Sequence, residues 1–434
     1  MKIYQPLFFA VLFILLGCSS DSSSEGPSSS DTSAPNAPTN LSASNTTISS
    51  TDLNWTGSSD NVGVTSYSVF QDNVALVSTP STSHTVNGLA ANTTYSFKIK
   101  ARDAAGNESG FSNAINVQTE DNTATLVTTS GDIETYLGDF IDTAPGDSGN
   151  DYQQPTTEQL NTWNMVVDAI LNEDITTAVS KSAEVNYQIN EFTDTSVTPS
   201  MAFYVVEEKS PKSNYWGTYV FSKTPTIDNL IIQAPHIKND INTGKEAVYC
   251  FKNTMAKAVF ISGTHRCNHS GASSCSGTTS TCNSGSQPYR ISDLAHNTVS
   301  VFQKTTENVF NSVANSVFIQ LHGFGKNDSD PFVILSNGTR ETPTADYAVG
   351  IRDALLVEDA SLTFKIAHID TDWTRLIGFT NTQGRLINGS TNPCSTSATA
   401  TSGRFIHIEQ EKTKLRDDAT GWAKMSNALE SVFN

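Results

Sequence analysis

The sequence contains few charged residues and no cluster of basic ones. Only 16% of its 434 residues are charged, and 44 acidic side chains outnumber 26 basic ones, which gives a net charge of −18. Surfaces that bind nucleic acid need clustered lysine and arginine to neutralise phosphates. The composition therefore argues against nucleic acid as a partner.

Several catalytic motifs are missing as well. The chain has no GxSxG sequence, which carries the nucleophile of α/β-hydrolases. It has no HExxH sequence, which supplies two zinc ligands and a base from one helix. No glycine-rich loop of the dinucleotide- or phosphate-binding type follows a predicted strand. The six cysteines include no CxxC pair, so a cysteine zinc cluster is not indicated.

A long apolar run is absent, and a short one lies at the N-terminus. Lys2 precedes apolar residues 7–16, which are too few to span a membrane and are typical of a secretory signal peptide. The run leads into Leu-Leu-Gly-Cys, ending at Cys18. This resembles a bacterial lipoprotein box, in which the cysteine becomes the lipidated first residue.

The lipoprotein resemblance implies that residues 1–17 are a signal peptide and that Cys18 carries lipid. The protein would then be exported to the cell envelope, at the outer membrane or cell surface, and would touch the membrane only through its anchor. A plain signal peptide with a chance cysteine is the alternative. Residues 18–36, rich in Ser, Asp, Glu and Pro, are expected to form a flexible tether.

Five cysteines remain, and disulfides are expected among them in an exported protein. Cys267, Cys275 and Cys282 lie in one loop rich in Ser, Gly and Thr. Such a loop has few apolar side chains to pack, so a disulfide is expected to hold it in place. We expect one pair within this loop and a second pair that includes Cys250 or Cys394. The odd number leaves one thiol free.

Residues 37–119 show short strand patterns separated by turn residues. In residues 94–100, aromatic and aliphatic side chains alternate with polar ones. The segment resembles a fibronectin type III domain over nearly its whole length, through Pro38, Leu41, Trp55, Tyr67, Leu89, Tyr95 and residues 101–109. The resemblance implies an all-β sandwich of seven strands. Such modules space or present other parts, and glycan or protein contact is the alternative role.

Residues 120–154 are expected to form a linker with a short helical patch, and residues 155–434 alternate between strand and helix patterns. This alternation predicts an α/β domain with a mainly parallel sheet flanked by helices. Strands are expected at 202–207, 216–221, 230–234, 258–262, 317–321, 332–335, 364–367 and 405–408. Helices are expected at 155–172, 245–253, 293–311, 345–357 and 419–433.

Histidines directly follow three of the expected strands, at His236, His265 and His322. The carboxyl ends of parallel strands meet at the edge of the sheet where α/β proteins bind ligands, so these imidazoles are expected close together. Asp240 lies within one turn of His236, and imidazoles with a carboxylate and an open position are the ligands of catalytic zinc. Glu409 lies at the end of an expected buried strand, where burial of its carboxylate costs free energy unless the group has a partner or a catalytic role. Beside an activated water it would be a general base.

This order of residues resembles the zinc carboxypeptidase-like superfamily, particularly its poly-γ-glutamate hydrolase and N-formylglutamate amidohydrolase branches. The matching residues are Ala234-Pro235-His236, Asp240 and Thr243, then Leu321-His322-Gly323, and finally Ile408-Glu409 with Leu415-Arg416. The resemblance implies Zn²⁺ held by His236, Asp240 and His322, with Glu409 as the base. It also implies a peptide or amino-acid amide as substrate, cleaved next to a carboxylate.

The acidic ligand departs from the pattern of this superfamily. It is an aspartate, and its distance along the chain from His236 differs from that in HxxE and in the hydrolase branch. Glu246, further along in the next predicted helix, is therefore an alternative to Asp240.

Three further residues are candidates for substrate binding. His265 and Arg266 follow the second strand, where they would grip a carboxylate or polarise a carbonyl, and a structural role is the alternative. Arg352, on a predicted helix, is either a carboxylate anchor or a solvated side chain. Two other functions stay open. One is a non-enzymatic surface lipoprotein with a degenerate hydrolase domain, and the other is a serine-type hydrolase with residues 322–325 as an oxyanion loop.

Overall fold

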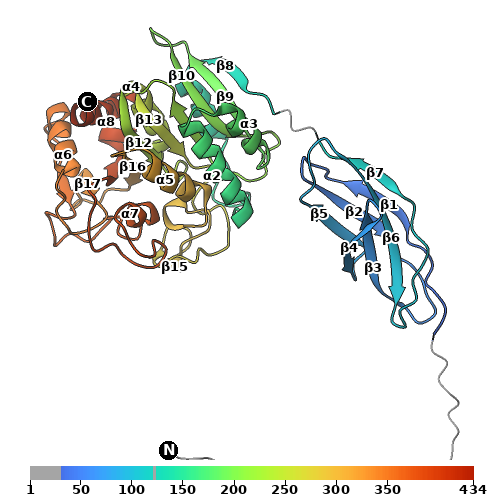
Figure 1. Cartoon of the computed structure of the whole chain (residues 1–434). Coiled ribbons are helices and arrows are strands. Elements are labelled where there is room, and N and C mark those ends of the chain that lie inside the picture. Colours follow the sequence, from blue (N-terminus) through green and yellow to red (C-terminus); the bar gives the residue numbers. More distant parts are fainter. Residues whose placement is uncertain (1–30, 121–123) are drawn as a thin grey trace, which may run out of the picture. The chain divides into compact units, whose positions relative to one another are not determined.

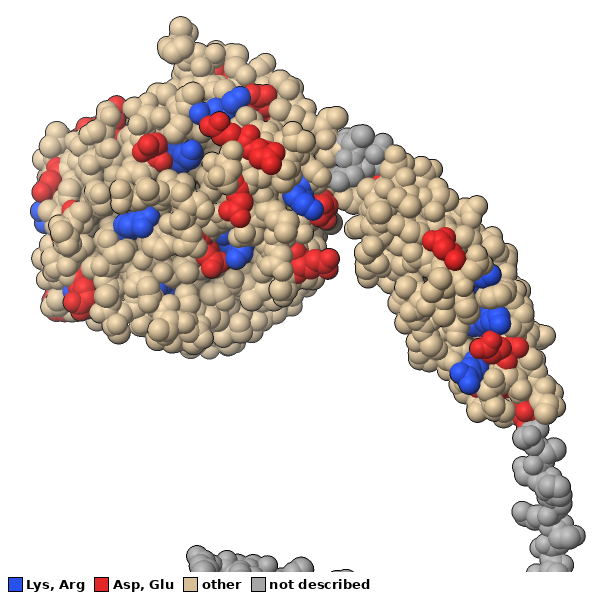
Figure 2. Space-filling view, in the orientation of Figure 1, with Lys and Arg blue, Asp and Glu red and all other residues tan. Residues whose placement is uncertain are grey.

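The computed structural model describes residues 31–120 and 124–434. They form two compact units, and the boundary between the units in the sequence lies after Glu120 (Figure 1). The expected signal peptide, Cys18 and most of the expected tether lie outside the described residues. None of the helices in the described ranges has the length and apolarity needed to cross a lipid bilayer. On the face drawn in Figure 2, lysines and arginines lie singly or in small groups among acidic and uncharged side chains.

The first unit is a sandwich of a three-stranded and a four-stranded sheet. Alternate side chains of its longest strand, β6, point into the core, which includes Phe97, Ile99 and Trp55. The seven-strand sandwich expected for residues 37–119 is confirmed. Its strands are β1 Thr39–Ser44, β2 Ser50–Thr56, β3 Val64–Gln71, β4 Val74–Thr79, β5 Ser83–Asn87, β6 Thr94–Asp103 and β7 Ile115–Gln118.

The second unit is built on one ten-stranded sheet in the order β18-β17-β19-β16-β12-β13-β11-β10-β9-β8. Its strands are β8 Val127–Gly131, β9 Tyr187–Asp194, β10 Met201–Glu208, β11 Thr218–Ser222, β12 Ile227–Ala234, β13 Ala256–Ile261, β16 Val317–Phe324, β17 Val333–Ser336, β18 Phe364–Ile366 and β19 Phe405–Glu411. The four neighbours β13, β12, β16 and β19 run parallel. β9, β10 and β11 pair antiparallel, as does β17 with β19. The parallel sheet expected from sequence is therefore found at the centre of a mixed one.

Helices cover both faces of this sheet (Figure 1), and each face has its own core. Side chains of the central strands alternate between the two cores, as Ile231 and Ile232 do in β12. One face carries α1 Ile133–Thr143, α4 Thr243–Asn253, α6 Tyr347–Glu358 and α8 Ala419–Phe433. The other carries α2 Thr157–Leu171, α3 Ile175–Ala183, α5 Val301–Ser312 and α7 Thr382–Ile387.

Side-chain caps decide where several of these helices begin. Thr156 and Gln159 form a reciprocal capping box at the start of α2. The helix expected over 293–311 begins only at Val301, because Ser300 accepts a hydrogen bond from the Gln303 backbone and acts as its cap. Residues 294–296 form a separate 3₁₀ turn. This break leaves the stretch before α5 free to line the site described below.

The linker expected over 120–154 is shorter than its composition indicates. Residues 127–131 form β8, which pairs in parallel with β9, and α1 follows. Ile133, Leu137 and Ile141 of α1 are buried in the core at helical spacing. The short helical patch expected in this stretch is α1, and abundant Asp, Thr and Gly around it give the stretch the composition of a linker. The α/β unit therefore begins well before residue 155.

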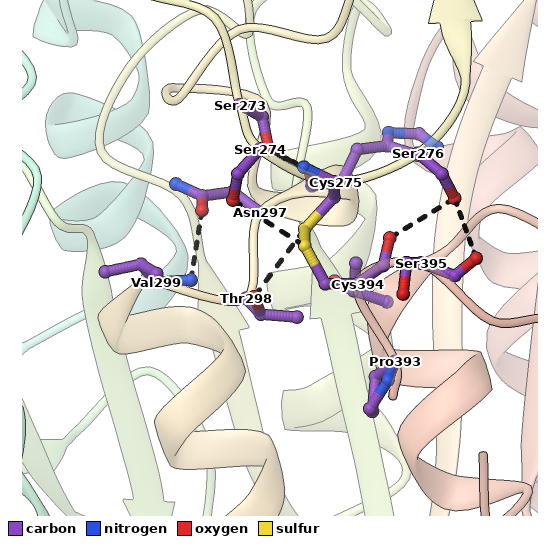
Figure 3. Close-up of a disulfide and its surroundings, with 12 residues drawn as sticks. Ser273, Ser274, Cys275, Ser276, Asn297, Thr298, Val299, Pro393, Cys394 and Ser395 are labelled. Atoms are coloured by element: carbon purple, nitrogen blue, oxygen red, sulfur yellow. Dashed lines mark hydrogen bonds between the residues drawn. A yellow bond between two sulfur atoms is a disulfide. The ribbon is translucent and has the colours of Figure 1, made fainter. Parts of the chain in front are cut away.

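Two disulfides hold the loop between β13 and α5, and they match the pairing expected from sequence. Cys267 joins Cys282 within the loop, and Cys275 joins Cys394 (Figure 3). Cys250 is a free, buried thiol. Regular structure in this loop is limited to the short strands β14 Thr278–Thr279 and β15 Gln287–Pro288 and the 3₁₀ turn at residues 294–296. Covalent links therefore replace much of the apolar packing that the loop lacks.

We expect the two disulfides to differ in their contribution to stability. The Cys275–Cys394 bond closes a segment of 119 residues, and the Cys267–Cys282 bond closes one of 15. Replacing Cys275 and Cys394 by Ser should lower the free energy of unfolding of the second unit by about 3–5 kcal/mol, against about 2–3 kcal/mol for the shorter link. Urea unfolding checks this order, with Cys250→Ala as the control that removes no disulfide. Equal losses for the two pairs would contradict it.

Candidate metal centre and cleft

Three potential ligand atoms converge beyond the carboxyl ends of β12 and β16. The chain turns after Ala234, and the Asp240 amide donates to the His236 carbonyl at 2.9 Å, which places the two side chains one turn apart. His322 lies near the end of β16, which pairs in parallel with β12. The Nδ1 atoms of His236 and His322 and Oδ2 of Asp240 are each 3.2 Å from the other two.

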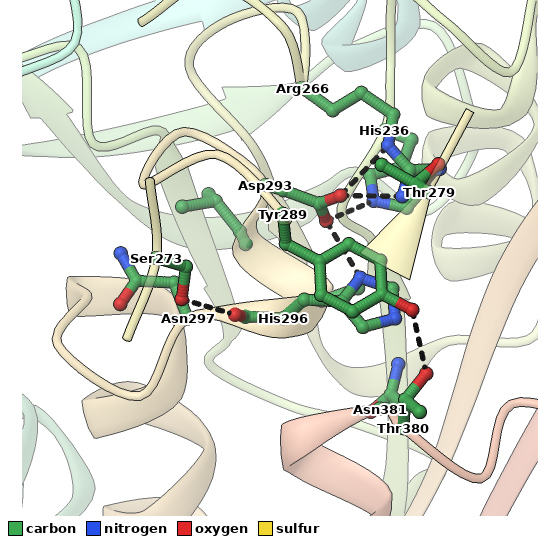
Figure 4. Close-up of polar contacts among 12 residues, drawn as sticks. His236, Arg266, Ser273, Thr279, Tyr289, Asp293, His296, Asn297, Thr380 and Asn381 are labelled. Carbon is green, nitrogen blue, oxygen red and sulfur yellow. Dashed lines mark hydrogen bonds and ion pairs between the residues drawn. The ribbon is translucent and has the colours of Figure 1, made fainter. Parts of the chain in front are cut away.

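Both imidazole rings are oriented from their far side. Nε2 of His236 lies 2.9 Å from Oδ1 of Asp293, and Nε2 of His322 lies 2.8 Å from Oε1 of Gln320 (Figure 4 for His236). Carboxylate and amide oxygens only accept hydrogen bonds, so each Nε2 carries a proton. The lone pair of each Nδ1 is then directed at the shared point beside Asp240.

The donor set fits a zinc ion. Ligand atoms around tetrahedral zinc, with bonds of about 2.0–2.1 Å, lie about 3.3–3.4 Å apart, close to the spacing found here. Burial raises the pKa of Asp240, but both histidines lower it further, and the pKa lies well below its usual value. Burial and the neighbouring His407 hold the pKa of His322 well below its usual value. Asp240 is therefore ionised and His322 neutral, as metal ligands must be. Burial and Arg266 lower the pKa of His236, but Asp293 and Asp240 raise it above its usual value overall, so His236 must release a proton to bind an ion through Nδ1.

Glu409 stands beside this cluster on the neighbouring strand. β19 pairs in parallel with β16, and His322 is directly opposite Glu409 in the register. The Glu409 side chain is buried, and its Oε2 accepts no hydrogen bond from the described residues. Its Oε1 is 3.3 Å from Nε2 of His407, two residues earlier on the same face. The carboxylate thus has a free oxygen for a proton or a ligand.

His236, His322 and Glu409 line one cleft with a volume of about 510 Å³, and Asp240 lies behind the two histidines, outside the lining of the cleft. Loops supply most of its walls: Thr278, Thr279 and Thr281 from the disulfide-bridged loop, and Thr374 and residues 376–380 from the segment before α7. Tyr289 stacks on His296 at 3.7 Å between ring centroids and bonds to Thr380 Oγ1 at 3.0 Å (Figure 4). This contact joins the two walls across the cleft.

Arg266 is the cleft residue that carries a fixed positive charge. Its Nε donates to Oδ2 of Asp293 at 2.9 Å, and its Nη2 contacts the same oxygen. Nη1 lies 3.4 Å from Nδ1 of His236, at the edge of the cluster. Burial opposes the ionisation of Asp293, but Arg266 above all holds the pKa of that carboxyl well below its usual value.

The other two candidates for substrate binding lie elsewhere. His265 Nδ1 accepts a hydrogen bond from the Cys267 amide at 3.1 Å, so it supports the turn of its own loop, and it does not line the cleft. Arg352 lies on α6, pairs with the adjacent Asp353 and is likewise outside the cleft. Of the three candidates, the structure brings only Arg266 to the cluster.

Glu246, the alternative ligand, is separate from the two histidines. It lies on α4, where Gln410 donates to its Oε2 at 2.9 Å, and burial raises its pKa to about 8. The carboxylate that joins the histidines is Asp240. Arg416 lies nearby and is also structural: it donates to the Gln410 carbonyl at 3.0 Å and lies against Gly323. A Cβ at position 323 would overlap the guanidinium, which explains the glycine after His322.

A second group of possible ligands shares one histidine with the first. His236, Asp293 and His296 lie within ligand distance of one another, with Nδ1 of His296 2.9 Å from Oδ1 of Asp293. The charge of Asp293 is already balanced by Arg266, which disfavours a cation there. Asp293 therefore fits better as the residue that orients His236.

Sequence reasoning missed the roles of Gln320 and Tyr289. Gln320 precedes His322 by two residues, so both lie on one face of β16, and a glutamine inside an otherwise apolar strand was the available signal. Tyr289 lies in an irregular loop, and no periodic pattern identifies it as a wall of the cleft. Asp293 lies at the start of the stretch expected as a helix over 293–311, and no local pattern indicates that it contacts His236.

Comparison with known proteins finds similarity through the first unit. The profile of the fibronectin type III domain matches residues 36–118. Chitinase A1 of Niallia circulans is 44% identical over 117 residues, which are 25% of this chain and 17% of the chitinase. Exoglucanase A of Cellulomonas fimi is 45% identical over 93 residues, 21% of this chain and 11% of the enzyme.

The solved structures similar to this chain include another chitinase. A chitinase of Bacillus thuringiensis, ChiA74, is 44% identical over 22% of this chain and 15% of that chain, with a TM-score of 0.20. The chain spans less than a fifth of the length of each of these three relatives. What they share with it is the sandwich of the first unit. Residues 36–118 are a fibronectin type III domain.

Proposed function

We propose that the second unit is a zinc-dependent hydrolase that cleaves an amide or peptide bond next to a carboxylate, in the manner of carboxypeptidases or amidohydrolases. One observation carries this proposal. Two oriented imidazole nitrogens and a carboxylate oxygen lie 3.2 Å from one another, and both imidazoles line the same cleft as a buried glutamate. This is the donor set of catalytic zinc beside a group able to move a proton.

His236, Asp240 and His322 would hold the ion. Zinc bound there would supply Lewis acidity, which polarises a carbonyl and lowers the pKa of water toward ~7. Asp293 and Gln320 keep the two rings in the tautomer that offers Nδ1. Glu409 takes a proton from the attacking water on its free Oε2, holds it, and delivers it to the leaving amine.

Arg266 would bind an oxygen of the substrate. Asp293 engages its Nε and Nη2, which leaves Nη1 beside the cluster as a donor. A guanidinium suits a carboxylate or a polarised carbonyl. Peptides, γ-glutamyl polymers, cell-wall peptides and formyl amino acids all contain an amide close to a carboxylate, so they define the substrate class.

Two alternatives fit the cleft less well. A serine-type hydrolase needs a serine nucleophile, and no serine is among the described residues that line the cleft. A degenerate, purely binding domain would have no need to keep both rings oriented beside a buried glutamate with one unpartnered oxygen. Burial of polar groups without partners costs free energy, so their presence in a cleft favours a functional role.

The fibronectin type III domain would act by contact rather than chemistry. Its relatives include proteins named chitinase and exoglucanase, which favours contact with a glycan surface, and a protein surface is the alternative. With the signal peptide and Cys18 anchor expected from sequence, this would be an exported, lipid-anchored enzyme of the bacterial cell envelope.

Metal content tests the ligand set without any substrate. The purified protein should bind one zinc ion, and His322→Ala should abolish this binding. Gln320→Met should weaken it about 10- to 100-fold, because the far side of His322 loses its acceptor. Competition with a chromophoric chelator measures both effects. His84→Ala in the first unit is the control and should leave zinc affinity unchanged. Equal zinc binding by wild type and His322→Ala would refute the site.

Substitution of Glu409 tests the catalytic role. Glu409→Gln should retain zinc and lower kcat/KM about 10²- to 10⁴-fold, because the amide cannot take the proton. The assay uses a panel of γ-glutamyl peptides, formyl amino acids and peptides with free carboxyl termini. Turnover by the variant at the wild-type rate would rule out Glu409 as the base. Zinc binding without wild-type activity on the whole panel would favour the binding protein.

A further inference from the structure

Three carboxylates of the first unit meet far from the cleft residues in sequence. Asp31 lies ahead of β1, Asp60 in the loop between β2 and β3, and Asp103 at the end of β6. Each offers an oxygen, and these oxygens all lie within 4.8 Å of one another. In the described part of this unit, an ion pair joins Lys100 to Glu108, and none of the three aspartates takes part in one. Three like charges are therefore gathered without a cation from the protein.

Two oxygens in this group are shielded from solvent and have no partner. Oδ1 of Asp31 accepts from Asn61 Nδ2 at 3.1 Å, but its Oδ2 accepts no hydrogen bond. Oδ2 of Asp60 accepts from the amides of residues 62 and 63, both at 2.9 Å, but its Oδ1 accepts none. Asp103 is only 3% exposed. Buried carboxylate oxygens without donors carry a large desolvation cost, which a bound cation offsets.

We propose that Asp31, Asp60 and Asp103 form a calcium site in the fibronectin type III domain. Ca²⁺ is a hard cation that takes only oxygen ligands at about 2.3–2.6 Å, so two ligands of one ion lie up to about 5 Å apart. The group of aspartates meets that limit and contains no histidine or thiol.

The site ties together three parts of the unit. Hydrogen bonds already link these parts in pairs: Nδ2 of Asn107 donates to Oδ2 of Asp103 at 2.8 Å and to the Asp31 carbonyl at 3.1 Å, and Nδ2 of Asn61 donates to Oδ1 of Asp31 at 3.1 Å. Calcium fixes the segment that leads into β1 against the loops that follow β2 and β6. It does not depend on the hydrolase chemistry of the second unit, because no ligand is shared with the cleft.

Calcium binding by the full chain tests this site. Titration calorimetry should detect one Ca²⁺ per chain with a Kd in the range of about 10⁻⁴–10⁻³ M, as is typical for extracellular modules. Calcium should also raise the temperature of one thermal transition, since it binds only the folded form. Asp60→Asn and Asp103→Asn should each weaken binding at least about tenfold, because each removes one of three charges.

Two controls make the result specific. Asp72→Asn changes a carboxylate of the same unit outside the group, at a position with a φ of 50° that asparagine tolerates, and it should leave calcium affinity unchanged. His322→Ala should also leave it unchanged, which separates this site from the zinc site. Absence of binding at 10 mM Ca²⁺, or equal affinity in wild type, Asp60→Asn and Asp103→Asn, would overturn the proposal.

Discussion

The parallel register of β12, β16 and β19 is the constraint on which the cleft depends. Gln233 pairs with Gln320, and His322 pairs with Glu409, so the ends of three strands lie side by side. A slip of one residue between strands would move a side chain to the opposite face of the sheet. Apolar residues on both faces of these strands prevent that slip, because each face packs into its own core. Packing of the core on both faces of the sheet therefore fixes the positions of the cluster residues relative to one another.

Orientation of the rings then needs polar atoms inside that core. Gln320 accepts from His322, and its amide donates to Gln233 at 3.0 Å and to Gln383 at 3.2 Å. Gln233 in turn donates to Thr306 at 2.8 Å. A buried polar network of this kind destabilises the fold when some of its groups lack hydrogen-bond partners, and it is rigid when all of them have partners. It fixes His322 at the end of β16, and Asn381, just before α7, donates to the same Gln320 oxygen.

The sequence predicts eight of the ten strands of the large sheet and the histidines after three of them, because apolar runs of strand length and short turns are local signals; it misses β8 and β9, in which polar residues interrupt the apolar ones. It cannot decide between Asp240 and Glu246, because that choice depends on how the chain turns after β12. The turn brings the shorter Asp240 back over His236, whereas Glu246 on α4 points toward Gln410. The partners of the rings, Asp293 above all, come from distant segments and leave no local pattern.

Asp293 links the orientation of His236 to the position of Arg266, two residues that lie far apart in the sequence. One of its oxygens orients His236, and the other holds Arg266. Because the carboxylate is fully buried and shared, a shift of the arginine toward an incoming anion would also move the acceptor of the histidine. His296 contacts the same carboxylate and stacks on Tyr289, which resists such a shift from the opposite wall. The position of the guanidinium and the direction of the His236 lone pair are therefore one structural property, set by a single buried charge.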